Sequence, residues 1–270
     1  MAKMKLEGLP KCLWINLDRA QERRSYMESQ FKDWGISDQL RIPAIDGMNA
    51  DLEKHLSGGF PPHLIPSEAA CVISHLEAIK YFLYETDLDE VLIMEDDLDF
   101  SLAKLWNFTW KEMRERLPVN WDTCQFTIIN PMAIMIKLHQ RFINDFSAAC
   151  YLISRHHAAK LMRMHEEGKR WKLNLNILPR ASSENVILDS GKSYAIPLFN
   201  YRMDLGSFIR EEHLEKFHRA SSEGLNKAWQ EQGPSFDIGN LMALEVYSGR
   251  LPKPPQAAGA VGGGDESFSR

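Results

Sequence analysis

Four acidic residues occur within five positions directly after an apolar segment. Residues 91–94 are Val, Leu, Ile and Met. They are followed by Glu95-Asp96-Asp97 and, after one intervening residue, by Asp99. The apolar segment has the length of a buried strand, and ligands of open α/β sheets bind at the carboxyl ends of strands. Hard divalent ions such as Mg²⁺ and Mn²⁺ take carboxylate oxygens together with substrate phosphate oxygens. The run predicts a divalent-metal site; an acidic loop in solvent is the simpler alternative.

A second polar group lies where an earlier apolar run gives way to a predicted helix. It contains one asparagine and three arginines: Asn16-Leu17-Asp18-Arg19, Arg23 and Arg24. A helix N-terminus already carries about half a positive charge, so further cations there are unfavourable unless an anion joins them. Helix N-termini also bind phosphate readily. The group predicts a phosphate site, and the alternative is a solvated face on which Glu22 and Glu28 pair with the arginines.

A third group combines carboxylate, sulfur and imidazole. Glu68, Cys71 and His75 have the spacing i, i+3 and i+7, which places them on one face of a predicted helix. A Cys–His nucleophile pair is conceivable, but it would lack an orienting third group and an oxyanion hole. A two-ligand metal site is a second interpretation. The favoured interpretation is a core cysteine beside a hydrogen-bonded histidine that lines a cleft.

One phosphate-binding signature is a decoy. Gly191-Lys192-Ser193 matches the end of a P-loop, but the required earlier glycine is replaced by Val186. The segment also leads into a predicted strand, whereas a P-loop leads into a helix. We therefore expect no P-loop here.

Composition bounds the class of protein. The 270 residues are 44% hydrophobic and 26% charged, with a net charge of -5, which argues against a broad basic face for nucleic acid. The four scattered cysteines are expected to be free, mostly buried thiols: Cys12, Cys71, Cys124 and Cys150. The sequence has neither a signal peptide nor an apolar run of membrane-spanning length. A cytoplasmic protein is expected, with peripheral membrane association through its acceptor as a variant.

Strand-like and helix-like segments alternate along the chain. Strands are expected near residues 12–17, 41–45, 90–94, 123–130, 148–153 and 194–199, and helices near 18–33, 67–84, 101–117, 155–167, 183–188 and 208–231. The predicted helix N-caps are Asp18, Ser67, Ser154 and Ser183. This alternation predicts an α/β three-layer domain with a mostly parallel sheet. Residues 251–270 are rich in Pro and Gly and are expected to form a flexible tail.

Taken in order, these segments resemble glycosyltransferase family 25, which includes bacterial lipooligosaccharide galactosyltransferases and collagen galactosyltransferase domains. The resemblance covers about residues 12–100 and rests on four segments: Ile15-Asn16-Leu17-Asp18-Arg19 with Glu22-Arg23-Arg24 and Met27, Ala44-Ile45-Asp46-Gly47, Ser67-Glu68-Ala69-Ala70-Cys71 with Ser74-His75, and Val91-Leu92-Ile93-Met94-Glu95-Asp96-Asp97. Weaker matches follow at residues 149–154 and 197–198. The chain departs from the family at Ser67 and Ala70, where Gly is usual, and at residues 182–185, where a Pro-Val-Asp segment is expected.

The resemblance implies one catalytic domain over residues 10–250 with a GT-A-type, nucleotide-sugar-binding α/β/α fold and a mixed, mostly parallel sheet. It further implies a metal-dependent, inverting transfer of a hexose, galactose or glucose, from a UDP-sugar to a glycan or lipooligosaccharide acceptor. Asp97 would be the direct ligand of Mn²⁺ (or Mg²⁺), with Glu95 supporting the metal or the ribose. The nucleotide sugar would be held by Asn16, Leu17, Arg19, Arg23, Asp46, His75, Glu95 and Asp96. Inversion needs a carboxylate base, for which Glu184 is the first candidate and Asp189 the second.

Two further interpretations stay open. The same donor chemistry could serve a nucleic-acid base or a protein side chain, because basic residues cluster at 169–172 and 202–210. Alternatively, the chain could be a non-catalytic nucleotide-binding module. The intact Glu95 and Asp97 argue against that second interpretation.

Overall fold

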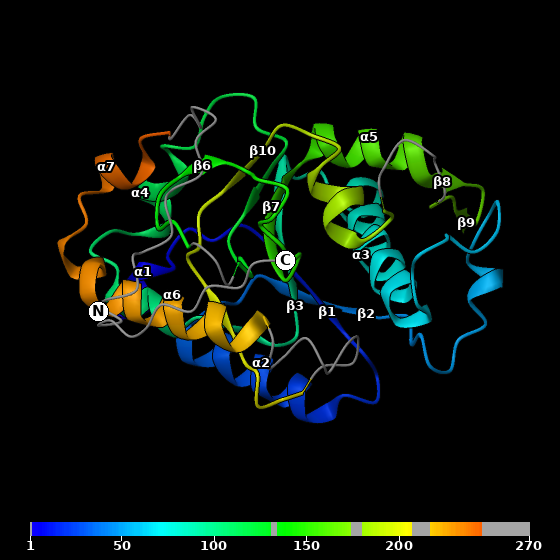
Figure 1. Cartoon of the computed structure of the whole chain (residues 1–270), viewed down its shortest axis with the longest axis horizontal. Coiled ribbons are helices and arrows are strands. Elements are labelled where there is room, and N and C mark those ends of the chain that lie inside the picture. The colour runs from blue at the N-terminus through cyan, green and yellow to red at the C-terminus, as the bar shows by residue number, and fades with distance from the viewer. Residues whose placement is uncertain (1, 131–133, 174–179, 207–216, 245–270) are drawn as a thin grey trace, which may run out of the picture.

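Seven strands join into one mixed sheet. In the computed structural model, which describes residues 2–130, 134–173, 180–206 and 217–244, the spatial order of the sheet is β2 (Gln39–Pro43), β1 (Cys12–Asn16), β3 (Glu90–Glu95), β7 (Cys150–Ser154), β5 (Thr123–Gln125), β10 (Ser193–Ala195) and β6 (His139–Gln140) (Figure 1). Only β7 and β6 run against the other five strands. The expected mostly parallel α/β sheet is confirmed.

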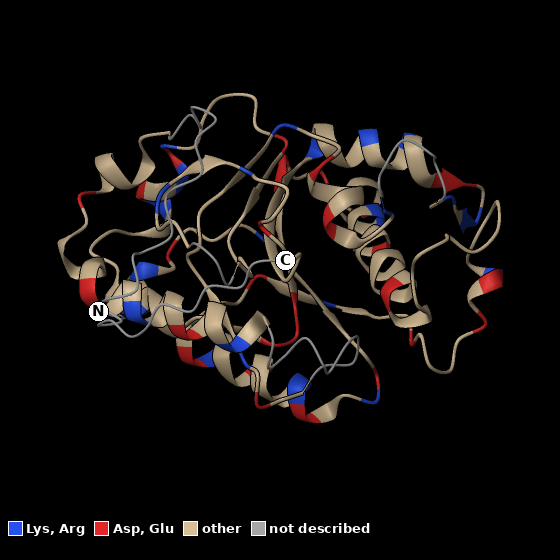
Figure 2. Ribbon diagram, in the orientation of Figure 1, with Lys and Arg blue, Asp and Glu red and all other residues tan. Residues whose placement is uncertain are grey.

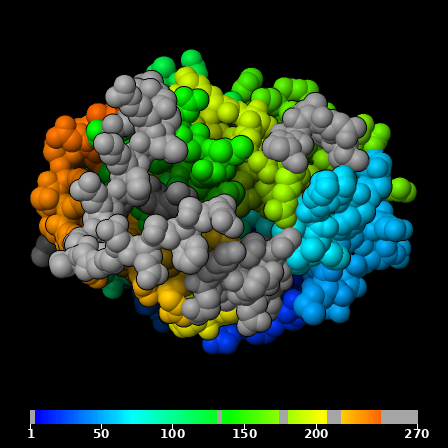
Figure 3. All heavy atoms as spheres, in the orientation of Figure 1, coloured from blue at the N-terminus to red at the C-terminus, as the bar shows by residue number. Residues whose placement is uncertain are grey.

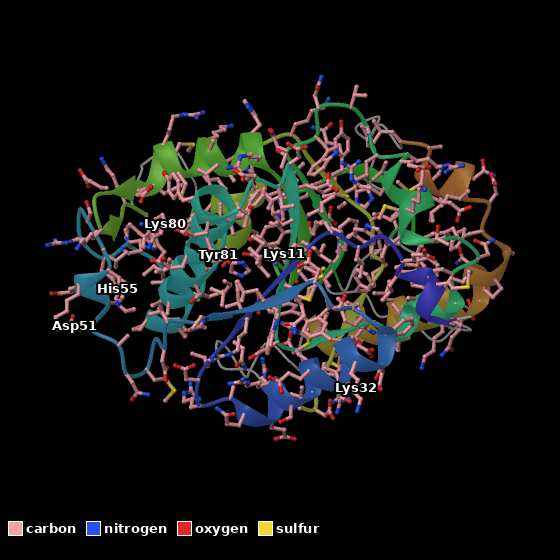
Figure 4. The ribbon with its side chains drawn as sticks, turned by 180° about the vertical axis from the view of Figure 1, so that it is seen from behind. Lys11, Lys32, Asp51, His55, Lys80 and Tyr81 are labelled. Carbon is pink, nitrogen blue, oxygen red and sulfur yellow. The ribbon has the colours of Figure 1, made fainter. Side chains whose placement is uncertain are left out.

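Helices cover both faces of the sheet. Side chains of a strand point alternately to opposite faces, so the apolar strands present two apolar faces that must be buried. In β1, Cys12 and Trp14 enter a core formed with α2 (Gln21–Trp34), α4 (Trp110–Arg114), α6 (Arg219–Gln232) and α7 (Ile238–Met242). Leu13 and Ile15 enter the opposite core, formed with α3 (Pro66–Glu85) and α5 (Arg155–His165). Seen from behind, α3 with Lys80 and Tyr81 lies beside the sheet, and Asp51 and His55 lie at the outer edge beyond it (Figure 4).

Short elements complete the described chain. They are α1 (Ala2–Lys5), η1 (Leu52–Lys54), β4 (Leu98–Asp99), η2 (Ser101–Leu105), β8 (Glu166–Glu167), β9 (Arg170–Trp171), η3 (Glu184–Leu188), β11 (Asn200–Tyr201) and η5 (Gly233–Ser235). Strand β11 pairs with β4 in an antiparallel arrangement. This pairing brings a segment from late in the sequence against the acidic run that follows β3.

The helix predicted over residues 101–117 is wrong as a single element. The chain forms η2, is extended at Trp106, and begins again as α4. Trp106 and Phe108 stack with ring centroids 5.1 Å apart, and both are buried. The second start is fixed by Thr109, whose side chain accepts a hydrogen bond from the backbone N–H of Glu112. Burial of two aromatic rings and this capping box outweigh helix continuity.

The predicted N-caps had mixed outcomes. Ser154 caps α5 by accepting from the backbone N–H of His157, as predicted. The prediction that Asp18 caps the first long helix was wrong, because α2 begins at Gln21 and Asp18 pairs with Arg41 instead. Ser67 was also wrong, because Pro66 occupies the first turn of α3, a position that suits its fixed φ. Ser183 precedes the π-helical turn η3 without a side-chain cap.

Figure 2 shows Lys and Arg residues interspersed with Asp and Glu residues along the helices. On the face seen in Figure 3, residues near 50–75 lie at one end and residues near 230–240 at the other. None of the helices described here combines the length and the apolar character needed to cross a membrane. The predicted tail, residues 251–270, lies outside the described residues.

Candidate active site

One pocket opens at the carboxyl ends of the parallel strands β1 and β3, the position where open α/β sheets bind ligands. It is walled by the β1–α2 junction, by the turn after β2, by one face of α3 and by the acidic run after β3. Its lining includes all nine residues predicted to hold the nucleotide sugar or the metal, namely Asn16, Leu17, Arg19, Arg23, Asp46, His75, Glu95, Asp96 and Asp97. Asn16 and Asp97, which are 81 residues apart in sequence, therefore line the same pocket.

The floor of the pocket is a buried polar network centred on Asp96. One carboxylate oxygen accepts from Asn16 Nδ2 at 2.7 Å and the other from Arg23 Nη1 at 2.7 Å. Asn16 Nδ2 also donates to the carbonyl of Ala20 at 3.2 Å, which ties the end of β1 to the start of α2. Buried charges are tolerated when they are paired and hydrogen-bonded. Asp96 is therefore held by two partners, and its neighbours Glu95 and Asp97 line the same pocket.

Three residues outside the predicted nucleotide and metal set complete this network. Arg41 Nε donates to Asn16 Oδ1 at 2.8 Å, and Arg41 Nη2 to the carbonyl of Asn16 at 3.1 Å. The carbonyl of Gly206 accepts from Arg23 Nη2, and the backbone N–H of Arg202 donates to the carbonyl of Asp97 at 2.8 Å. No short-range signal marks these partners, because their pairing depends on the order of strands in the sheet.

Asp97 is the carboxylate whose charge is least stabilised. Burial raises its pKa to about 7, and the negative charges of Glu95 and Asp96 act in the same direction against the favourable charge of Arg23. Arg23 Nη1 lies 3.2 Å from Asp97 Oδ2, but it is shared with Asp96. A cation placed at Asp97 would remove this penalty. The donor set is made of carboxylate oxygens, which fits Mn²⁺ or Mg²⁺.

His75 is fully buried and links Glu95 to the core. Its Nε2 lies 3.3 Å from Glu95 Oε1, and its Nδ1 lies 3.0 Å from the hydroxyl of Tyr151. Burial opposes ionisation of Glu95, but the hydrogen bond and charge of His75 and the charges of Arg23 and His218 hold its pKa below the ordinary value. The predicted hydrogen-bonded histidine lining a cleft is confirmed. His218, near enough to act on Glu95, was not singled out from the sequence.

Cys71 differs from the other three cysteines. All four are free thiols, but Cys12, Cys124 and Cys150 are buried, whereas Cys71 is half-buried and lines the pocket. Its sulfur lies 3.3 Å from Ser183 Oγ. Burial raises the pKa of the Cys71 thiol well above its ordinary value, and the charge of Glu95 adds to this effect. The expected core cysteine is thus a pocket residue.

The turn after β2 forms a second wall. Asp46 accepts from Arg19 Nε at 2.7 Å, from Asn49 Nδ2 at 2.8 Å and from the backbone N–H of Met48 at 3.1 Å. The hydrogen bond from Arg19 leads the interactions that lower the pKa of Asp46 to about 2. Gly47 packs against the first turn of α3, where a Cβ would lie 2.6 Å from Ser67 Cα. The Asp-Gly pair predicted as a turn therefore fixes the position of this wall.

The two candidate bases lie outside the pocket lining. Glu184 Oε1 accepts from the backbone N–H of Ser147 at 3.0 Å, and its neighbour Ser183 contacts Cys71 at the pocket wall. Asp189 is engaged on both oxygens, by Arg141 Nη1 and by Asn185 Nδ2. Glu184 is thus close to the pocket, whereas Asp189 is held in an ion pair away from it.

The described residues of the P-loop match and of the two basic clusters are not among those that line the pocket. Ser193 of the discounted P-loop match begins β10, and a Cβ on Gly191 would lie 2.6 Å from the ring of His157, so no phosphate-binding loop forms there. In the basic cluster at 169–172, Trp171 is buried and pairs in the β8–β9 hairpin. Of the cluster at 202–210, residues 207–210 lie outside the described residues.

The fold and pocket define an α/β protein with a polar, carboxylate-bearing site at the carboxyl edge of its sheet. The sequence model of glycosyltransferase family 25 (LPS biosynthesis protein) matches residues 10–175, more than half of the chain. The chain belongs to this family. The matched range contains every predicted nucleotide-sugar and metal residue, whereas Glu184 and Asp189 lie beyond it.

Related proteins share only part of their length with this chain. A "Glycosyltransferase 25 family member" of Drosophila melanogaster is 36% identical over 105 residues, which cover 35% of this chain and 17% of that protein. A protein of the same description from Drosophila pseudoobscura pseudoobscura is 35% identical over 98 residues, or 32% of this chain and 15% of that protein. The matching part of this chain thus spans less than a fifth of these relatives. A crystal structure of a protein from STIV aligns with 73% of this chain and 88% of its own, at 9% identity and a TM-score of 0.38.

Proposed function

We propose that this glycosyltransferase moves a hexose, galactose or glucose, from a UDP-sugar to a hydroxyl of a glycan or lipooligosaccharide acceptor, with inversion at the anomeric carbon. The observation that carries the proposal is the convergence of the acidic run after β3 with the arginines of the β1–α2 junction in one pocket. Opposite charges at one site suit a ligand that combines a diphosphate with a divalent cation.

The donor side of the pocket is supported by three elements. Arg19 lies at the rim with an exposed guanidinium held by Asp46, where its charge favours a diphosphate. The first turn of α2 begins beside it, and helix N-termini add a positive potential and backbone donors. Arg23 and Asn16 are engaged with Asp96 in the floor. We infer that these two residues position the acidic run and act on the nucleotide through it.

Asp97 and Glu95 are the proposed ligands of Mn²⁺ or Mg²⁺. Burial and the charges of neighbouring carboxylates penalise the ionised form of Asp97 and raise its pKa, and a cation bound by Asp97 would offset this penalty. The cation, when bound, supplies Lewis-acid stabilisation of the departing UDP. His75 holds Glu95 from behind, and the ring of His75 is itself fixed by Tyr151.

Glu184 is the proposed base that takes the proton of the acceptor hydroxyl. The Ser147 N–H holds one of its oxygens, and its neighbour Ser183 contacts the pocket wall at Cys71. A base must come within hydrogen-bond reach of the hydroxyl it deprotonates, which favours a carboxylate beside the pocket over Asp189 with both oxygens engaged.

A panel of nucleotide sugars tests the donor. The purified chain is incubated with Mn²⁺ and UDP-, GDP- or CMP-linked sugars, and the released nucleotide is quantified with and without EDTA. We expect UDP release from UDP-galactose or UDP-glucose that EDTA abolishes. Release from a GDP- or CMP-sugar instead, or release unaffected by EDTA, contradicts the donor or the metal part of the proposal.

Acceptor class is tested in the same assay. Oligosaccharide, lipooligosaccharide, DNA and hydroxyl-bearing peptide are added separately to the matching UDP-sugar. The proposal expects stimulation by a saccharide acceptor. Stimulation by DNA or peptide alone would replace it, and nucleotide binding without turnover of any donor would favour a non-catalytic module.

A further inference from the structure

Sulfur, nitrogen and oxygen donors from two elements meet at the pocket wall. Cys71 and His75 belong to α3, and Glu95 ends β3. Within the described parts of the chain these form the one group of three metal-ligating side chains whose ligand atoms all lie within 4.8 Å of one another. Residues four apart on a helix share one face, which explains why both side chains of α3 reach the same carboxylate.

The distances suit a tetrahedral ion. Zn²⁺ binds cysteine sulfur at about 2.3 Å and histidine nitrogen or carboxylate oxygen at about 2.0–2.2 Å, so ligand atoms around it lie about 3.5 Å apart. His75 Nε2 and Glu95 Oε1 are already 3.3 Å apart. The Cys71 sulfur lies within 4.8 Å of both atoms and must approach them to about 3.5 Å to complete the triangle.

The surroundings orient the ligands as metal sites require. Histidine ligands usually engage their second ring nitrogen with a fixed partner. Here His75 Nδ1 lies 3.0 Å from the hydroxyl of Tyr151, which leaves Nε2 directed at Glu95. Ser183 Oγ, 3.3 Å from the Cys71 sulfur, supports the third ligand in the same way.

We propose that Cys71, His75 and Glu95 form a three-ligand site for a borderline-soft divalent cation, with Zn²⁺ as the natural occupant. Thiolate and imidazole select Zn²⁺ and Co²⁺, whereas the neighbouring carboxylates select Mg²⁺ or Mn²⁺. As the metal–sulfur bond forms, the thiol proton of Cys71 leaves to solvent, without oxidation or reduction. The fourth position stays open to water or to a substrate oxygen.

Sharing of Glu95 gives the site a regulatory consequence. A soft cation bound by Cys71 and His75 withdraws Glu95 from the arrangement proposed for Mn²⁺ at Asp97. Zn²⁺ is therefore expected to inhibit glycosyl transfer in competition with Mn²⁺. This consequence rests on the proposed function, whereas binding by the three ligands does not.

Cobalt binding tests the site without any substrate. The purified full chain is titrated with Co²⁺ and followed by absorption spectroscopy. We expect a thiolate-to-cobalt charge-transfer band with tetrahedral d–d bands, saturating at one ion per chain and bleached by Zn²⁺. Cys71→Ser should remove the charge-transfer band, and His75→Asn should weaken binding at least about tenfold. Circular dichroism and the Tm establish that each variant is folded.

Cys124→Ala is the matched control, because Cys124 is a free thiol of β5 that is buried away from the pocket. It should keep the full cobalt spectrum. Absence of the band in the wild type, persistence of the band in Cys71→Ser, or its loss in Cys124→Ala overturns the site. Zn²⁺ inhibition equal in wild type and Cys71→Ser overturns the competition with Mn²⁺.

Discussion

Arg23 and Asp96 form an ion pair beneath the pocket, with Nη1 2.7 Å from Oδ1 and side chains only 7% and 8% exposed. The same guanidinium also faces Asp97 at 3.2 Å. One buried cation therefore faces both Asp96 and Asp97, the second of which is a proposed metal ligand. This pairing of α2 with the segment after β3 is what makes an acidic run at the end of a buried strand tolerable.

Replacement of Arg23 should be strongly destabilising. Arg23→Met leaves two carboxylates without their buried partner, and removal of one member of a buried pair costs about 3–5 kcal/mol. The measurement is the free energy of unfolding in urea. Arg24→Ala is the control, since Arg24 lies on the same helix in an exposed pair with Glu28 and should change stability by about 0.5 kcal/mol or less. Similar losses in both variants would contradict the account.

Substitution of Gly47 should destabilise the fold, because the backbone of α3 leaves no room for a Cβ at this position. Its Cβ would lie 2.6 Å from Ser67 Cα and 2.7 Å from the carbonyl oxygen of Pro66, both backbone atoms. Gly47→Ala should cost about 1–3 kcal/mol and weaken nucleotide binding, because the turn that carries Asp46 must shift. Gly224→Ala in α6 meets only Ile134 Cδ1 at 3.6 Å and should be neutral or stabilising. Equal stability of the two variants would exclude this close contact.

Asp46 should make stability depend on pH in a defined window. Its pKa in the folded chain is about 2, below the ordinary 3.8, so its contribution is present above about pH 4 and lost as pH falls toward 2. Integrated over that window the contribution is about 2 kcal/mol. In Asp46→Asn the decline in unfolding free energy across this range should be smaller by that amount. If the unfolding free energies of the wild type and Asp46→Asn fall in parallel between about pH 4 and pH 2, the ionised Asp46 does not stabilise the fold.

The two candidate bases can be separated by one pair of variants. Glu184→Gln should lower kcat by about 10²–10⁴-fold while UDP binding is retained, because loss of a base affects proton transfer and leaves the donor contacts intact. Asp189 pairs with Arg141 and lies outside the pocket lining. The variant Asp189→Asn keeps the size of this side chain and should retain most of the turnover. The reverse ranking would move the base to Asp189.

Much of the site could be predicted because its chemistry is local in sequence. The acidic run, the arginines after β1 and the Asp-Gly turn each stand out by residue type, and parallel strand ends bring them to one edge. The partners of these groups could not be predicted. The bond from Arg41 to Asn16 and the bond from Arg23 to Gly206 depend on strand order and on the β4–β11 pair, which short-range patterns do not reveal.

The fold was predicted better than its boundaries. The continuous apolar run of β1 and the long apolar face of α3 indicated a buried strand beside a helix, as α/β layers require. The single helix expected over residues 101–117 failed because two aromatic side chains, Trp106 and Phe108, are buried in the middle of it. The capping box Thr109-x-x-Glu112 was a readable signal for the second helix start.

Release of UDP by Asp97 variants tests whether Asp97 holds the cation that stabilises the leaving group. Wild type, Asp97→Asn and Asp99→Asn are assayed with Mn²⁺ and a UDP-hexose; Asp99 belongs to the same acidic run but bonds to Ser101 and lies outside the pocket lining. We predict at least about 100-fold loss in Asp97→Asn, since metal stabilisation of the leaving group is worth several kcal/mol, and near-normal turnover in Asp99→Asn. Full UDP release by Asp97→Asn, or equal loss in both variants, would contradict the account.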